Sequence, residues 1–329
     1  MKKFLAMSIA FLMALSFVAC GKTAVVEPEV ETPQVESPQV ETPGESEVAT
    51  TYVERDDWDA FVKTNVNAFM DMYGHGSNNY DENSYVVFDF DNTCSIFDIE
   101  EQLAVYQLQQ MAFVFTPEDA EKILLTELGD AQMLRGTDYS EVDSSYNDWV
   151  TDITAAYSYL YDTYGPFTAK GLDDEAVIKV QADPQWIEFA TKMRAMYDLV
   201  YDSESASVAY PWVLYWFTGM TEEEVYDLAL ASHNYYGAVE TSEVTWSTSL
   251  EGSKVGAVEY TWTSGTGVPE NIKELWAALQ ANGIEVWVCS ASGIDPIRAA
   301  IDAFGLHEYC TGAIAMSRVL EDGKYVNAY

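Results

Sequence analysis

Two aspartates, Asp89 and Asp91, stand two residues apart directly after the short apolar run Tyr85–Phe88. Because side chains of a strand repeat with a period of two, both carboxylates are expected on one side of the chain. In open α/β sheets the ligand crevice lies beyond the carboxyl ends of the strands. Two acids there could bind a hard cation such as Mg²⁺, and they could divide nucleophilic and acid–base work on a phosphate ester.

The residues that follow this pair could hold the phosphate itself. Thr93 offers a hydroxyl, and the backbone N–H groups around Asn92 offer further donors. A second apolar run, 284–289, ends at Ser290 and Ala291, and a helix is expected soon after them. A hydroxyl beside helix N-terminal amides is a ready anion site. Asp98, Glu100 and Glu101 could line the entrance to this site, but the favoured interpretation is a helix N-terminus, where acids are stabilised by the dipole.

These runs predict the elements that position the pair. Residues 52–73 repeat apolar side chains at helical spacing, and 85–88 is predicted to be a buried strand. A helix from Pro269 is expected to stop near Gly283, before a second buried strand at 284–289. Strand, polar loop, helix and strand in this order are typical of a parallel α/β sheet. The final stretch, 313–329, is expected to form a hairpin that turns at Asp322-Gly323.

About 200 residues separate Asp89 from Ser290, whereas a βαβ unit needs only about 30. The excess predicts an inserted second domain at 116–264, mainly helical. Expected helix starts lie at Thr116-Pro117, Asp183-Pro184 and Thr221. A hairpin is expected to pair 244–246 with 258–262, because both segments alternate apolar and polar residues. The core is then expected to comprise residues 51–115 and 265–329.

The N-terminus indicates export. Lys2 and Lys3 precede the apolar run 4–18, which is short for a spanning helix and typical of a signal peptide. Phe17–Gly21 is similar to a bacterial lipobox, so residues 1–19 are expected to be removed and Cys20 to carry lipid. An ordinary cleaved signal is the alternative. Residues 20–50 repeat Pro and Glu and contain no aromatic residue before Tyr52, so they predict a disordered tether to a membrane.

Charge and cysteine content exclude one class of partner and one kind of scaffold. The formal net charge is −38 and the isoelectric point is near 4.1, which excludes nucleic acid as a partner because a polyanion would be repelled. Any phosphate site therefore needs a local cation. With Cys20 lipidated, three cysteines remain, so a disulfide framework is not expected. We expect Cys94, Cys289 and Cys310 to be small buried hydrophobic residues.

The segment Val86-Val-Phe-Asp-Phe-Asp-Asn-Thr93 resembles the first motif of the haloacid-dehalogenase-like hydrolases, and 286–292 resembles their second. The Ser-Ala-Ser form and the helical insert are similar to the phosphoserine- and phosphorylcholine-phosphatase branch. The resemblance implies a Rossmann-like parallel sheet core with a helical cap. It also implies a Mg²⁺-dependent phosphomonoesterase that acts on a small phosphorylated metabolite. By this resemblance Asp89 is the nucleophile and a metal ligand, and Asp91 is the general acid and base and gives its backbone carbonyl to the metal. Asn92, Thr93, Ser290 and Ala291 would hold the phosphate.

The sequence departs from that family in one respect. The family places a Lys and then an acidic motif after its second motif, and neither is found between Ser290 and Tyr329. The basic residues there are Arg298, Arg318 and Lys324. We expect the core to be incomplete at its C-terminal end, with a degenerate family member as the other interpretation. The alternative function is a non-catalytic surface lipoprotein that binds a small ligand or partner.

Four aromatic residues in the insert, Tyr210, Trp212, Tyr215 and Trp216, invite two interpretations. They could form a cage that binds a quaternary ammonium group by cation–π contact. The favoured interpretation is that they form the core of the insert.

Overall fold

The computed structural model describes residues 49–129, 134–136 and 141–329. The expected signal peptide, the lipidated Cys20 and nearly all of the tether lie outside these residues. Within them, no helix is both long and apolar enough to cross a bilayer.

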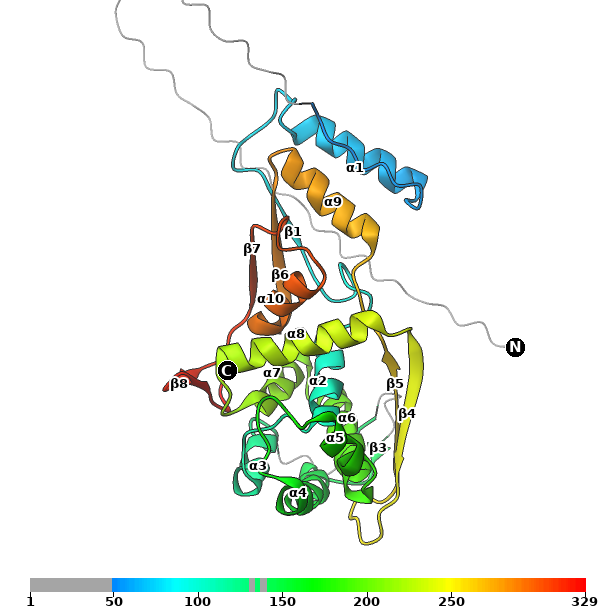
Figure 1. Cartoon of the computed structure of the whole chain (residues 1–329), viewed down its shortest axis with the longest axis vertical. Helices are drawn as coiled ribbons and strands as arrows, with labels where there is room; N and C mark the ends of the chain where they lie inside the picture. The colour runs from blue at the N-terminus through cyan, green and yellow to red at the C-terminus, as the bar shows by residue number, and fades with distance from the viewer. Residues whose placement is uncertain (1–48, 130–133, 137–140) are drawn as a thin grey trace, which may run out of the picture. The chain divides into compact units, whose positions relative to one another are not determined.

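Three parallel strands form the sheet of the core (Figure 1). They are β1 (Tyr85–Phe88), β6 (Glu285–Gly293) and β7 (Gly312–Met316), in the order β1-β6-β7. Phe88 pairs in register with Val288, so the residues that follow β1 lie beside Ser290 near the end of β6. The expected mixed α/β fold with a parallel sheet is confirmed.

One face of this sheet is covered by helices. The Phe88 ring lies 5.5 Å from that of Trp276 in α9 (Glu270–Ala281). Helices α1 (Ala60–Tyr73) and α10 (Ile294–Ala303) contribute to the same cluster of buried side chains. The cluster includes Val53, Met70, Phe90, Ile99, Leu279, Val286, Val288, Ile297 and Ile301.

Helix α1 is shorter than predicted. It begins at Ala60 because the Asp59 side chain accepts hydrogen bonds from the backbone N–H groups of Phe61 and Val62, at 3.0 and 3.1 Å. Asp59 is therefore the N-cap, and the helix begins at the next residue. Residues 52–59, predicted as the first part of this helix, are not helical.

The other face of the sheet is exposed among the described residues. Tyr85 and Ile314 are 64% and 63% exposed, and Val87 is also exposed. The prediction that β1 is a buried strand is therefore wrong, because Tyr85 and Val87 are exposed and Val86 and Phe88 are half-buried. Cys289 lies on the same face and is exposed, which corrects its assignment as a buried thiol, whereas Cys94 is buried as expected. Cys310 is half-buried.

Residues 99–238, which include most of the predicted insert, are mainly helical. The elements from residue 99 to 238 are α2 (Ile99–Gln110), α3 (Pro117–Leu124), β2 (Leu134–Arg135), β3 (Glu141–Val142), α4 (Tyr146–Tyr164), α5 (Asp174–Gln181), α6 (Pro184–Ser203), α7 (Ala206–Leu214), the 3₁₀ turn Tyr215–Phe217 and α8 (Glu222–Ala238). The three predicted helix starts are confirmed. Thr221 and Glu224 form a reciprocal capping box, and the Asp183 side chain caps α6.

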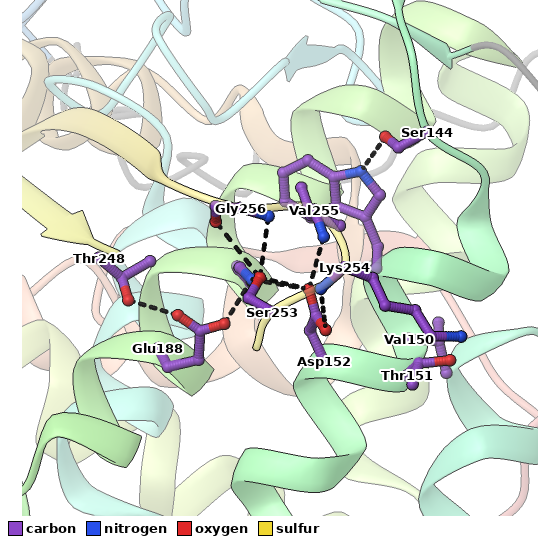
Figure 2. A network of polar contacts seen from close by, with 12 residues as sticks. Ser144, Val150, Thr151, Asp152, Glu188, Thr248, Ser253, Lys254, Val255 and Gly256 are labelled. Carbon is purple, nitrogen blue, oxygen red and sulfur yellow. Dashed lines mark hydrogen bonds and ion pairs between the residues drawn. The ribbon is translucent and has the colours of Figure 1, made fainter. Parts of the chain in front are cut away.

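The predicted hairpin is also present, as β4 (Ser242–Thr248) and β5 (Val258–Ser264), with Trp246 opposite Tyr260 and Val244 opposite Trp262. Its loop is attached to the helices by a buried polar network (Figure 2). Asp152 of α4 accepts hydrogen bonds from the backbone N–H groups of Lys254 and Val255, both at 2.9 Å.

Two side chains of α6 complete this network. Lys192 Nζ lies 2.8 Å from Asp152 Oδ2 and also contacts Glu188. Ser253 of the loop donates to Asp152 at 2.8 Å, and Thr248 donates to Glu188 (Figure 2). Lys192, Asp152 and Glu188 are all buried. The loop end of the hairpin is therefore held to α4 and α6 by hydrogen bonds to buried charged side chains.

The C-terminal prediction is partly corrected. Residues 312–316 form the third parallel strand and not one arm of a hairpin. The hairpin itself is shorter, with β8 (Leu320–Glu321) and β9 (Lys324–Tyr325) joined at Asp322-Gly323 as predicted. Its backbone joins the insert, because Tyr325 N donates to Met220 O at 2.8 Å.

Candidate functional site

A tight turn after β1 positions the two aspartates. The carbonyl of the fully buried Phe90 accepts hydrogen bonds from the N–H groups of Cys94 and Ser95, at 2.8 and 2.9 Å. Asn92 has a φ of 57°, in the left-handed region that asparagine tolerates better than most residues. The chain therefore reverses direction directly after β1, and the buried Phe90 side chain lies between Asp89 and Asp91 in the sequence.

Asp89 is exposed, and its Oδ2 accepts a hydrogen bond from Thr93 Oγ1 at 2.8 Å. Asp91 is more deeply placed. Its Oδ1 accepts from the backbone N–H of Ile99 at 2.8 Å. Its Oδ2 accepts from Ser292 Oγ at 2.8 Å and lies 3.3 Å from Ser290 Oγ. The two aspartates thus differ: one faces outward, and the other is held between β6 and the start of α2.

Burial raises the pKa of the Asp91 carboxyl, and the negative charge of Asp89 adds to this. The hydrogen bonds from Ile99 N–H and the two serines act in the opposite direction without cancelling the shift. A carboxyl with a raised pKa retains its proton to higher pH. Asp91 is therefore the member of the pair that is better suited to hold a proton.

The expected site residues meet in one cavity of about 160 Å³. Its lining comprises Asp89, Asp91, Asn92, Asp98, Glu100, Tyr210, Ser290, Ala291 and Ser292. Of the residues predicted to act on a phosphate, Thr93 alone is not part of the lining, and it contacts the site through Asp89.

Sequence reasoning missed Ser292 as a site residue, although its hydrogen bond to Asp91 is shorter than that of Ser290. The signal was available in principle, because Ser290 and Ser292 are two residues apart on one strand. It also left Glu100 as an ordinary helix-start acid. Glu100 is buried, and its Oε1 accepts a hydrogen bond from Gly293 N–H at 2.9 Å.

Asp98 caps α2 through the N–H groups of Glu100 and Glu101, at 2.8 and 3.0 Å. Burial, with the nearby charge of Asp91, raises the pKa of Asp98 to about 6. Burial likewise raises the pKa of Glu100. No Lys or Arg is among the residues that line the small cavity. The local cation expected for a phosphate site is therefore not supplied by this lining.

The donor atoms after β1 are of the type that Mg²⁺ prefers. Asp89 supplies a carboxylate oxygen and Asp91 a backbone carbonyl oxygen. In the described part of the chain no group of three or more His, Cys, Asp or Glu side chains is placed to hold a metal. Mg²⁺ is commonly bound by only one or two carboxylates, together with substrate phosphates and water. The residues present fit that mode of binding, with Asp89 and Asp91 as the protein ligands.

A second cavity of about 560 Å³ adjoins the first, because both are lined by Asn92, Asp98 and Tyr210. Of the four aromatic residues considered from the sequence, Tyr210 alone lines it. Trp212, Tyr215 and Trp216 are buried within the insert, as the favoured interpretation expected. The other aromatic residues of this cavity are Tyr197, Tyr201, Tyr260, Trp262 and Phe97.

Comparison with known proteins places the fold but not the activity. No protein-family model matches the chain, and no curated protein matches it. A crystal structure of a conserved protein of unknown function from Anaerococcus prevotii is similar, with a TM-score of 0.72 and 24% sequence identity. The match covers 85% of this chain and 74% of that one. This similarity shows a shared fold.

Proposed function

We propose that this protein is a Mg²⁺-dependent phosphomonoester hydrolase with a haloacid-dehalogenase-like core and a helical cap. One observation carries the proposal: two aspartates and two serines, from β1 and β6, share one cavity at the carboxyl ends of parallel strands. This is where open α/β sheets bind ligands. The substrate is proposed to be a small organic phosphate.

Asp89 is proposed as the nucleophile, because it is the exposed member of the pair. Its carboxylate oxygen forms a bond to phosphorus while the bond from phosphorus to the ester oxygen breaks. Asp91 transfers its proton to the departing oxygen, consistent with its raised pKa. A water then attacks the aspartyl phosphate and gives a proton to Asp91. Inorganic phosphate leaves, and both aspartates return to their starting states.

The surrounding residues orient the phosphoryl group. Thr93 fixes the Asp89 carboxylate through its 2.8 Å hydrogen bond. Asn92, Ser290 and Ala291 line the same cavity and offer hydroxyl, amide and backbone donors to phosphoryl oxygens. A Mg²⁺ ion held by Asp89 and Asp91 would neutralise part of the phosphate charge. This contribution matters here because no basic side chain lines the small cavity.

The location is proposed from the sequence. Removal of residues 1–19 and lipidation of Cys20 would anchor the protein to a membrane, and residues 20–50 would hold the folded part away from the surface. The anchor and nearly all of the tether lie outside the described residues.

The test is release of inorganic phosphate from 4-nitrophenyl phosphate by the full chain, with and without Mg²⁺. Asp89→Asn should abolish turnover, because an amide is not a nucleophile at phosphorus. Asp227→Asn makes the same chemical change at an exposed position on α8 and should leave turnover unaltered. No Mg²⁺-dependent release, or equal rates for the Asp89→Asn variant and the unaltered protein, would refute the proposal.

A second candidate function is binding without catalysis on the same scaffold. It is favoured by the lack of a basic side chain in the small cavity and by Gly293 N–H, which is already bonded to Glu100. Retained ligand binding together with no turnover of any phosphate ester would favour this candidate.

A further inference from the structure

Two segments connect the core with the insert, and they lie side by side. The N–H of Ile96 donates to Gly267 O at 2.7 Å, and Thr266 Oγ1 donates to Ile96 O at 2.8 Å. Two adjacent connections form a single pivot, and a domain attached in this way can rotate about it unless other contacts prevent the rotation. Contacts outside the pivot therefore decide whether the insert is fixed to the core.

The β8–β9 hairpin makes such contacts, because it follows β7 of the sheet in the chain and joins the insert in space. Its Tyr325 is 5% exposed and belongs to the buried cluster of the insert, not to that of the sheet. The N–H of Tyr325 donates to Met220 O, and the N–H of Gly219 donates to Tyr325 O, both at 2.8 Å. The hairpin is thus bound to the insert through its backbone.

The side chain of Tyr325 contacts the core as well. Its hydroxyl donates to Asp295, a buried residue in the first turn of α10 and three positions after Ser292. The space left between the hairpin, α7 and the start of α10 is about 10 Å³, roughly what one water needs. Tyr325 therefore bonds to the insert through its backbone and to the core through its hydroxyl.

Arg318, which precedes the hairpin, connects the same parts of the molecule. It is buried, and its guanidinium donates to Leu214 O and Thr218 Oγ1 of the insert and to Val326 O after β9. The guanidinium carbon also lies 4.8 Å from the centroid of the Tyr325 ring. A planar guanidinium can donate to several groups at once in fixed directions, which the ammonium group of a lysine cannot do.

We propose that the β8–β9 hairpin, together with Arg318, is a clamp that keeps the insert closed on the core. The larger cavity would then be a constant feature of the folded protein. A ligand of the smaller cavity would enter through it without a movement of the insert, since the two cavities share Asn92, Asp98 and Tyr210. The clamp does not depend on the proposed function, because it concerns contacts that exist without any reaction.

The first experiment measures hydrogen exchange of the full chain, resolved to short peptides by mass spectrometry. Tyr325→Phe removes the hydroxyl that bonds to Asp295 and keeps the ring. The N–H of Ile99, which donates to Asp91 Oδ1 at 2.8 Å, reports on separation of α2 from the turn after β1. Exchange should rise roughly tenfold at both Gly219 and Ile99, the effect of about one hydrogen bond on local opening.

Tyr164→Phe is the matched control. The Tyr164 hydroxyl donates to Asp183 Oδ2 at 3.0 Å, and both residues lie within the insert. This variant should leave exchange at Gly219 and Ile99 unaltered. Faster exchange at Gly219 alone in Tyr325→Phe would show that the hairpin only covers the insert, and it would overturn the clamp. No change at either residue, or the same change in Tyr164→Phe, would also overturn it.

The second experiment measures the distance between the insert and the core by pulsed electron spin resonance. Spin labels are attached at Phe61→Cys of α1 and Ile178→Cys of α5, which are 76% and 70% exposed. The full-length background has its four native cysteines replaced by alanine and must retain its circular dichroism.

With the hairpin unaltered, one narrow distance distribution is expected, and it should be the same with and without Mg²⁺ and inorganic phosphate. Arg318→Met and Tyr325→Phe should each add a second, longer distance. Tyr325→Phe serves as the test if Arg318→Met does not fold. Two distances in the protein with an unaltered hairpin, or a single unchanged distance in the hairpin variants, would refute the clamp.

Discussion

Replacing Lys192 by Met tests whether the buried ionic network holds the β4–β5 hairpin in place. Lys192 is fully buried between the carboxylates of Asp152 and Glu188, which are themselves almost inaccessible. Removing one member of such a group leaves buried charge without a partner. The expected loss is about 3–5 kcal/mol in the free energy of unfolding.

Lys179→Met is the matched control. Lys179 is also paired with a carboxylate one helical turn away, Glu175, but it is 63% exposed. Exposed pairs of this kind contribute roughly 0.5 kcal/mol or less. The two variants therefore make the same chemical change in opposite environments.

The assay is urea unfolding of the full chain at neutral pH, monitored by tryptophan fluorescence. The free energy of unfolding and its slope against urea concentration are compared between the variants. A difference in unfolding free energy between the two variants below about 1 kcal/mol would refute the reasoning, since the penalty for buried unpaired charge would be missing.

Three further predictions concern single residues. The pKa of Asp98 is raised to about 6, so the folded protein loses stability as pH rises from about 4 to 6 and this carboxyl must ionise in its buried site. Asp98→Asn removes that titration, so the free energy of unfolding of the variant minus that of the unaltered protein should increase over this range. A difference that stays constant with pH would contradict this. Iodoacetamide should label the exposed Cys289 before Cys94, which is buried and has a pKa raised to about 12; peptide mass spectrometry that finds the reverse order would contradict the fold. Gly283→Ala should cost about 1–2 kcal/mol or more in urea unfolding, because φ is 73° and a Cβ would meet the His75 ring; an unaltered midpoint would contradict this.

Local signals in the sequence predicted much of the fold. The capping box at Thr221, the strand of 85–88 and the turn at Asp322-Gly323 each depend on a few neighbouring residues, and each is present. Burial was less predictable. The run Tyr85–Phe88 is apolar throughout, so its composition cannot reveal that alternate side chains face outward. Residues 312–316 were assigned to a hairpin because their pairing with β6 is not a local property.

Some residues of the candidate site could be predicted from the sequence, and others could not. Asp89, Asp91 and Ser290 could be grouped because each follows an apolar strand, and carboxyl ends of parallel strands meet at one edge. Glu100 could not be assigned, since its contact with Gly293 joins α2 to the end of β6. The lining of the larger cavity was equally hidden, because Gln102, Asp202 and Trp262 line it together although they lie far apart in the sequence.

The central claim is that Asp89 accepts a phosphoryl group beside Asp91 and Ser290. A crystal structure of the protein with Mg²⁺ and beryllium fluoride, a mimic of a phosphoryl group, tests it most directly. The account predicts beryllium bonded to an Asp89 carboxylate oxygen, with fluorine atoms near Ser290 and the metal beside both aspartates. A well-ordered structure in which the cavity holds neither group, at concentrations that load other phosphatases of this chemistry, would contradict it.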